Sequence, residues 1–305
     1  MSRRNLAIDK PARADAVLHS PTLKARTMGV GRFFGNIWID AVTLVAVFFI
    51  FIVPFIFIVL TAAKTSQEAG LFQFSWPTHF QLIQNIQDVL SYGDGRMFRA
   101  LWNSTLLTVG SVTLIVLISA LAAYVMQRRH GRVSNIASSI ILAGLVIPPA
   151  VVPTIFLLQR LGLYKTIIGL IFVEVALGLP FAVLILRAFI GSIPAELDEA
   201  AIIDGASPLR VFFSIILPLL RPALVTVIIV QAVAIYNDFA APLYFLPGQD
   251  NVTAQLTLYS FMSQFSSQWN LLFADVLIIT ILPLIMFLFF QRQIVAGLTS
   301  GAVKG

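Results

Sequence analysis

Long apolar runs dominate this chain of 305 residues. A helix that crosses a bilayer needs about 20 consecutive apolar residues, and six runs satisfy that requirement: 41–63, 104–126, 136–158, 166–189, 222–243 and 271–290. Only 11% of the residues are charged, whereas a soluble domain normally carries about a quarter. The sequence therefore predicts an all-α, polytopic membrane protein with six transmembrane helices.

The positions of Lys and Arg predict how the six helices are oriented. With six spans, both termini lie on one side of the membrane. Most of the 20 basic residues lie in the terminal segments and in the loops after the second and fourth spans. Cytoplasmic loops carry the excess of Lys and Arg. We therefore expect a cytoplasmic tail over 1–40, a transmembrane domain over 41–290 with a cytoplasmic loop at 191–221, and a cytoplasmic tail over 291–305.

The chain lacks the residues that metal sites, histidine proton relays and nucleotide-binding or hydrolase sites need. The chain has no Cys, and His19, His79 and His130 lie outside the apolar runs, so we expect neither a metal site nor a His proton relay. The sequence contains no nucleotide-binding Gly-rich motif with Lys and no hydrolase motif. A net charge of +6 is explained by the cytoplasmic loops rather than by nucleic-acid binding. We expect no enzyme activity and no cofactor.

Prolines interrupt most of the predicted spans. Each proline removes a backbone donor and frees a carbonyl, which in lipid must find another partner. Single prolines are common in membrane helices, but Pro148, Pro149 and Pro153 form a cluster. We expect this cluster to break the third span.

The loop between the fourth and fifth spans predicts two short helices separated by a turn. Ser192 is a candidate cap for the first helix, with Pro194 in its first turn. Asp204-Gly205 is expected to end that helix, because Gly adopts a left-handed backbone without steric cost. Ser207-Pro208 has the residues of a second helix start.

The first helix of this loop combines acids with small side chains. Glu196, Asp198 and Glu199 lie near the positive end of its dipole. Ala200 and Ala201 would let the surface of another protein approach the backbone closely. Two interpretations remain open, a docking loop for a protein partner and an amphipathic connector on the membrane surface.

The spacing of this loop resembles the EAA loop of ABC-importer permeases. The family pattern is Glu-Ala-Ala, three residues, Gly, nine residues, Ile, one residue and Leu-Pro. The matching residues are Glu199, Ala200, Ala201, Gly205, Ile215, Leu217 and Pro218. Three further segments look like the carbohydrate branch of that family, namely 161–163, 179–181 and 236–239, as does the tail 297–305. Tyr236 and Asp238 depart slightly from the commonest form of that branch.

The resemblance covers roughly residues 41–305 and carries specific implications. The fold would be the six-helix type I ABC-importer permease fold in a bacterial inner membrane, similar to the maltose-type second permease. The partners would be a second permease, two cytoplasmic ATPases that hydrolyse ATP, and an external solute-binding protein. The carried solute would be a sugar or a related polyol. The coupling residues would be Glu199, Ala200, Ala201, Asp204, Gly205, Ile215, Leu217 and Pro218.

Polar residues inside the spans are candidates for the solute pathway. Glu174, Asp238 and Asp275 lie in the outward halves of their spans, where a charge must face protein or water. Gln231 is seven residues before Asp238, so the two share a helix face. The candidates for the substrate pathway are Gln231, Tyr236, Asn237, Asp238 and Glu174.

Two other functions for these polar residues remain open. They could tie helices together, and the three acids could form the relay of a proton-coupled secondary transporter. The second alternative does not explain the spacing of the cytoplasmic loop.

Overall fold

The computed structural model describes residues 30–129, 131–248, 251–262 and 268–302, and every regular element in these ranges is helical. The residues form two units, Met1–Val53 and Pro54–Gly305. Most of the expected N-terminal tail lies outside the described residues, as do His19, His130 and residues 303–305. The two units are described separately.

In the first unit, helix α1 (Val30–Val47) leads into a π-helical turn η1 (Phe48–Ile52). The side chains of residues 38–52 are exposed and mostly apolar. The helical run Trp38–Ala62 is long and apolar enough to cross a membrane. Apolar side chains on all faces of a helix are typical of a membrane span, so this run agrees with the predicted first span.

The second unit contains all the remaining elements. Two of its helices are much longer than the others, α5 (Arg96–Arg128) and α15 (Trp269–Ala302). The other elements are α2 (Val53–Ala62), α3 (Ser66–Ala69), α4 (Leu82–Ser91), α6 (Arg132–Val146), α7 (Val151–Arg160), α8 (Ile167–Ile190), α9 (Glu196–Ile203), α10 (Pro208–Val211), η2 (Phe212–Ile216), α11 (Leu217–Leu219), α12 (Arg221–Asn237), α13 (Ala240–Phe245), α14 (Ala254–Thr257) and η3 (Leu258–Phe261).

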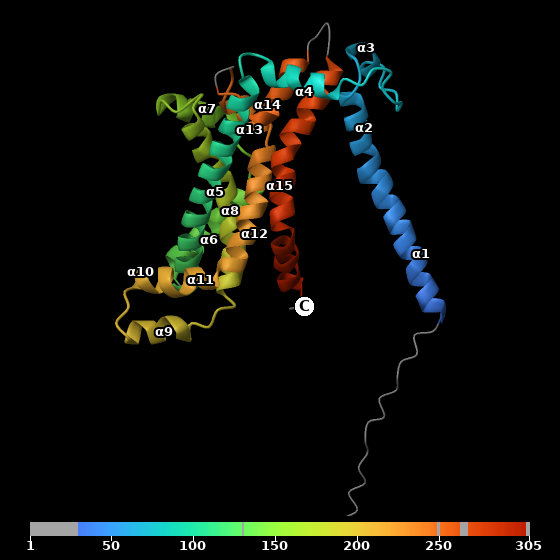
Figure 1. Ribbon diagram of the computed structural model, residues 1–305. Helices are drawn as coiled ribbons and strands as arrows, with labels where there is room; N and C mark the ends of the chain where they lie inside the picture. Colours follow the sequence, from blue (N-terminus) through green and yellow to red (C-terminus); the bar gives the residue numbers. More distant parts are fainter. Residues whose placement is uncertain (1–29, 130, 249–250, 263–267, 303–305) are drawn as a thin grey trace, which may run out of the picture. The chain divides into compact units, whose positions relative to one another are not determined.

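The core of the second unit is a bundle in which α5 packs against α8 and α12, and α12 packs against α15 (Figure 1). Small side chains such as Ala100, Ser111, Ser119 and Ala123 line the buried side of α5. Small residues allow close approach of helices in lipid, where apolar burial alone does not drive association. The bundle therefore holds together through close backbone packing.

Among the described residues, four helices are continuous candidates for membrane spans, and the count reaches six if each of two bent pairs is one span. The first bent pair is α6 and α7, which meet at 115°. Their junction at 147–150 contains Pro148 and Pro149, so the expected break in the third span is confirmed. Alone, α6 is about 22 Å long, shorter than a hydrocarbon core of about 30 Å.

The second bent pair joins the α10–α11 segment to α12 at 74°. The fifth span was expected to continue to residue 243, but α12 ends at Asn237. Asp238 explains the difference, because its Oδ1 accepts hydrogen bonds from the backbone N–H groups of Ala240 and Ala241 and so starts α13. The apolar sequence continues past Asn237, whereas α12 ends there.

The bundle has two distinct ends, which we call the α9 end and the α4 end after the helices that lie there (Figure 1). At the α9 end, α5 turns into α6 and α8 leads into α9. The opposite end carries α4, α7, α13 and α14. Since α5 ends at the α9 end and α8 begins at the α4 end, the bent α6–α7 segment carries the chain across the bundle once.

Candidate functional site

Helix α9, in the loop between α8 and α12, begins differently from the sequence-based prediction. The N-cap position is Ala195, with no side-chain cap. The prediction that Ser192 caps this helix is wrong, because its hydroxyl donates to the Phe189 carbonyl at 2.7 Å and completes the end of α8. Pro194 precedes the helix instead of lying in its first turn. The three acids Glu196, Asp198 and Glu199 do lie in the first turn.

The end of α9 agrees with the prediction. Gly205 has a φ of +83°. Its N–H donates to the Ile202 carbonyl at 3.0 Å, and the Ala206 N–H donates to the Ala201 carbonyl at 2.9 Å. This pair of bonds is the Schellman pattern, which requires a left-handed residue at the position of Gly205. The turn after α9 therefore depends on a residue that tolerates a left-handed backbone.

The second helix of the loop starts as predicted and contains an irregular turn. The Ser207 hydroxyl accepts a hydrogen bond from the Arg210 N–H at 3.4 Å, with Pro208 directly after it. The π-helical turn η2 then ends two residues before Pro218, as η1 does before Pro54. A proline ring clashes with the carbonyl four residues earlier, and a wider turn moves that carbonyl away. Ile215 and Leu217 pack against the core, while Pro218 is exposed.

One ion pair fixes α9 to the bundle. The Arg128 Nε at the end of α5 lies 2.5 Å from the Asp198 Oδ2. The same guanidinium donates to the Ile193 carbonyl at 3.1 Å. Asp198 is buried, and Ala201 packs into the core one turn later. Arg128 therefore connects the end of α5 both to α9 and to the segment that precedes α9.

The opposite side of α9 is open. Glu199, Ala200, Asp204 and Gly205 are exposed. Beside them, large apolar side chains are exposed at Ile202, Ile203 and Leu209, with Ile203 85% exposed. An apolar patch with acids next to it at a helix surface is a protein contact site or a membrane contact. The buried side fixes the helix, and the exposed side is free to bind.

Polar groups of α12 toward the α4 end tie helices together. The Gln231 Nε2 donates to the Gly178 carbonyl of α8 at 3.0 Å. The Tyr236 hydroxyl donates to the Ile279 carbonyl of α15 at 3.2 Å. Both bonds are buried, so they stabilise the packing of α12 against its two neighbours.

Three further polar residues, Asn237, Asp238 and Glu174, lie near the end of α12. Asn237 is exposed, and its Oδ1 accepts from the Gln255 Nε2 at 3.3 Å. The carboxyl group of Asp238 lies near that of Glu174 in α8. Glu174 is buried, and its Oε1 has no hydrogen-bond partner among the described residues. The structure thus brings Glu174, Asn237 and Asp238 to one place near the end of α12.

Asp275 of α15 occupies a separate buried position. Its Oδ2 accepts a hydrogen bond from the Thr257 hydroxyl at 2.8 Å, which links α15 to α14. A cavity of about 440 Å³ lies along α5, α12 and α15 and is lined mainly by apolar side chains together with Thr105, Thr108, Thr113 and Tyr236. The polar groups near the end of α12 and this cavity are candidate contacts for a solute.

Comparison with known proteins gives consistent matches. Residues 115–299 match the family described as binding-protein-dependent transport system inner membrane component. A putative ABC transporter permease protein of Caldicellulosiruptor sp. is 37% identical over 83% of this chain and 92% of its own length. The diacetylchitobiose uptake system permease protein of Streptomyces coelicolor is 31% identical over 84% of this chain and 85% of its own length.

A solved structure has a similar fold. It is a bacterial ABC transporter involved in the import of the acidic polysaccharide alginate, and the matched chain superposes with a TM-score of 0.70. The alignment covers 86% of this chain and 96% of that chain at 20% identity. The two chains therefore share the fold.

Proposed function

Because the chain belongs to the family of binding-protein-dependent transport system inner membrane components, we propose that it is the permease subunit of an ABC importer and forms half of a pathway for a sugar or sugar-like solute. The related uptake system for diacetylchitobiose supports this class of solute. The family match also favours this function over a proton-coupled secondary transporter.

The coupling part of the proposal rests on the difference between the two sides of α9. One side is fixed by the Arg128–Asp198 ion pair, and the other exposes Glu199, Ala200 and Gly205. A helix fixed in this way moves together with the ends of α5 and α8. Binding of an ATPase to the exposed side would therefore transmit its motion to the bundle. The motif residues Ile215, Leu217 and Pro218 would transmit it further through the bend into α12.

The membrane topology in this proposal has six spans, each bent pair counting as one. The α9 end faces the cytoplasm in this proposal, because cytoplasmic loops are rich in basic residues. The helix ends that lie there carry Arg128, Arg129, Arg132, Arg187 and Arg210. Both termini are then cytoplasmic, in a bacterial inner membrane. A second permease completes the pathway, two ATPases bind from the α9 end, and a solute-binding protein delivers solute at the α4 end.

For the solute pathway, we assign direct contact to Asn237 and Asp238, with the buried Glu174 next to Asp238. Asn237 is exposed, and the two carboxyl groups offer acceptors for hydroxyl groups of a polyol. Gln231 and Tyr236 instead shape the pathway, since their buried bonds set the position of α12.

The coupling part of the proposal is tested by blocking the exposed side of α9. In an Ala200→Trp variant the bulky ring would keep the partner from the backbone. We expect recovery of the ATPase with the purified permease to fall about tenfold or more, as for central interface residues. Ala240→Trp is the matched control, because Ala240 is also exposed but lies at the start of α13 at the α4 end. Equal ATPase recovery with both variants would refute the docking role of α9.

A further inference from the structure

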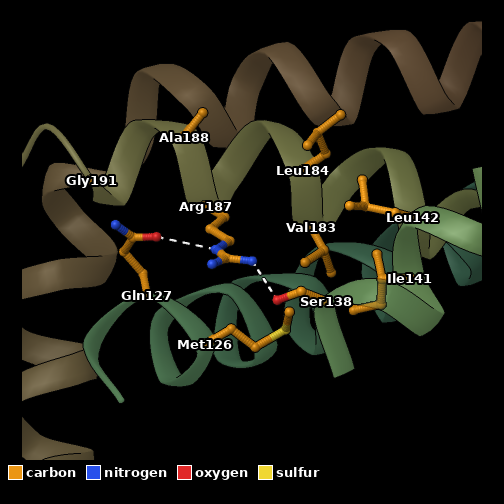
Figure 2. A pocket seen from close by; sticks show the side chains of 10 residues that line it. All are labelled: Met126, Gln127, Ser138, Ile141, Leu142, Val183, Leu184, Arg187, Ala188 and Gly191. Carbon is orange, nitrogen blue, oxygen red and sulfur yellow. Dashed lines mark hydrogen bonds between the residues drawn. The ribbon is translucent and has the colours of Figure 1, made fainter. Parts of the chain in front are cut away.

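A second charged feature lies at the α9 end, in a cavity of about 290 Å³ between α5, α6 and α8 (Figure 2). Arg187, in the last turn of α8, points into the space between the three helices. Its Nε donates to the Gln127 Oε1 of α5 at 3.1 Å, and its Nη1 donates to the Ser138 hydroxyl of α6 at 2.5 Å. The guanidinium therefore connects three helices through two neutral acceptors.

The positive charge of Arg187 has no carboxylate partner within the ranges that the structure describes, where the Arg128–Asp198 contact is the one ion pair. Arg187 is half-buried. A charged side chain at the edge of the hydrocarbon is costly unless it pairs with an opposite charge or reaches water. An arginine with free donor capacity facing a cavity is suited to bind an anion, and phosphate oxygens match its planar donors.

The walls of this cavity identify what the rest of the ligand must be. Apart from Arg187, Gln127 and Ser138, the side chains that line it are apolar and include Ile141, Leu142, Val183 and Leu184. A small hydrated anion would gain nothing from such walls. An anion that carries alkyl chains would cover them, because burial of each CH2 group contributes about 0.8 kcal/mol.

The helix surface and the charges around the cavity are also typical of a lipid-binding site. Helix α6 has no buried residues, and large apolar side chains are exposed on it at Ile136, Ile140 and Leu145. A second cavity of about 470 Å³ shares Met126 with the first and is lined by Arg129 and Arg132. Basic pockets between membrane helices on the cytoplasmic side bind anionic lipid head groups. The three arginines thus add positive charge to two neighbouring cavities.

We propose that this cavity binds an anionic phospholipid of the leaflet at the α9 end, with the phosphate at Arg187 and an acyl chain along Ile141, Leu142 and Leu184. This site is separate from the exposed side of α9 and goes beyond the proposed transport function. The bound lipid would hold α6 against α5 and α8. Since Gly191 at the end of α8 also lines the cavity, the lipid would stabilise the start of the segment that leads to α9.

The test measures lipid binding to the purified transporter complex by native mass spectrometry and by thermal stability during titration with phosphatidylglycerol. We expect binding to the unmodified protein and at least about fivefold weaker binding to Arg187→Gln. Arg210→Gln is the matched control, because Arg210 is an exposed arginine at the same end that lies outside both cavities. Equal binding by both variants would overturn the proposal.

A second variant keeps the arginine and fills the cavity. Leu142→Trp should weaken phosphatidylglycerol binding while leaving the charge of Arg187 in place, so the test does not depend on the folding of Arg187→Gln. Two further titrations identify the ligand class. Phosphatidylcholine binding as strong as phosphatidylglycerol would refute charge recognition, and equal stabilisation by inorganic phosphate would show a soluble-anion site instead of a lipid site.

Discussion

The Arg128–Asp198 ion pair gives the sharpest prediction, because it is a single contact that fixes α9. In an Arg128→Ala variant, α9 loses its bond to α5, and the Ile193 carbonyl loses its donor. Asp198 is left buried with 7% of its surface exposed and without its counter-charge. We expect α9 to detach from the bundle more often, while the packed helices stay folded.

The size of the effect follows from the burial of the pair. Removing one partner of a buried ion pair costs about 3–5 kcal/mol. The two side chains here are 18% and 10% exposed, so the lower end applies, about 3 kcal/mol. Since 1.4 kcal/mol is a factor of ten, the ratio of attached to detached α9 falls by roughly a hundredfold. Asp198→Asn keeps a neutral acceptor and should lose about half of that free energy.

The assay is amide hydrogen exchange of α9, combined with solute uptake by the reconstituted complex. The α9 amides should exchange roughly a hundredfold faster in Arg128→Ala, and uptake should fall while the ATPase still hydrolyses ATP. Arg160→Ala is the matched control, because Arg160 is an exposed arginine at the end of α7, at the opposite end of the bundle. Unchanged exchange and unchanged uptake in Arg128→Ala would refute the reasoning.

Three further predictions concern Gly205, Gly169 and Tyr236. Gly205→Val should reduce uptake at normal expression, because a β-branched residue at a φ of +83° costs about 2 kcal/mol; Gly205→Asn should keep most activity. Gly169→Ala should lower the melting temperature, because the Cβ of the new alanine would lie 2.1 Å from the Leu163 carbonyl oxygen. Gly131→Ala is the control and should leave the melting temperature unchanged, because the space around Gly131 is open. Tyr236→Phe should lower the free energy of unfolding by about 1 kcal/mol through loss of a buried hydrogen bond to α15, and an unchanged denaturation midpoint would contradict that role.

The parts of the fold that the sequence predicts correctly are those with local causes. Apolar runs give helices because lipid leaves no other partner for backbone groups. The Pro148-Pro149 pair breaks the helix locally, because each proline lacks a backbone N–H and its ring clashes with the preceding turn. The turn at Gly205 and the helix start at Ser207 also depend on residues within one turn of each other.

The parts that sequence reasoning missed depend on choices between several local partners or on distant contacts. Ser192 can cap either the helix after it or the carbonyls before it, and the structure uses it for α8. Asp238 ends α12 by starting α13, although the apolar run continues. Arg128 and Asp198 are 70 residues apart, and no pattern along the chain indicates that they meet.

The most direct test of the proposed function is solute uptake by vesicles that contain the permease pair with and without the cognate ATPases. We expect uptake to require both the ATPases and ATP, and we expect that a proton gradient cannot replace them. Uptake at the full rate by ATPase-free vesicles under a proton gradient would contradict it.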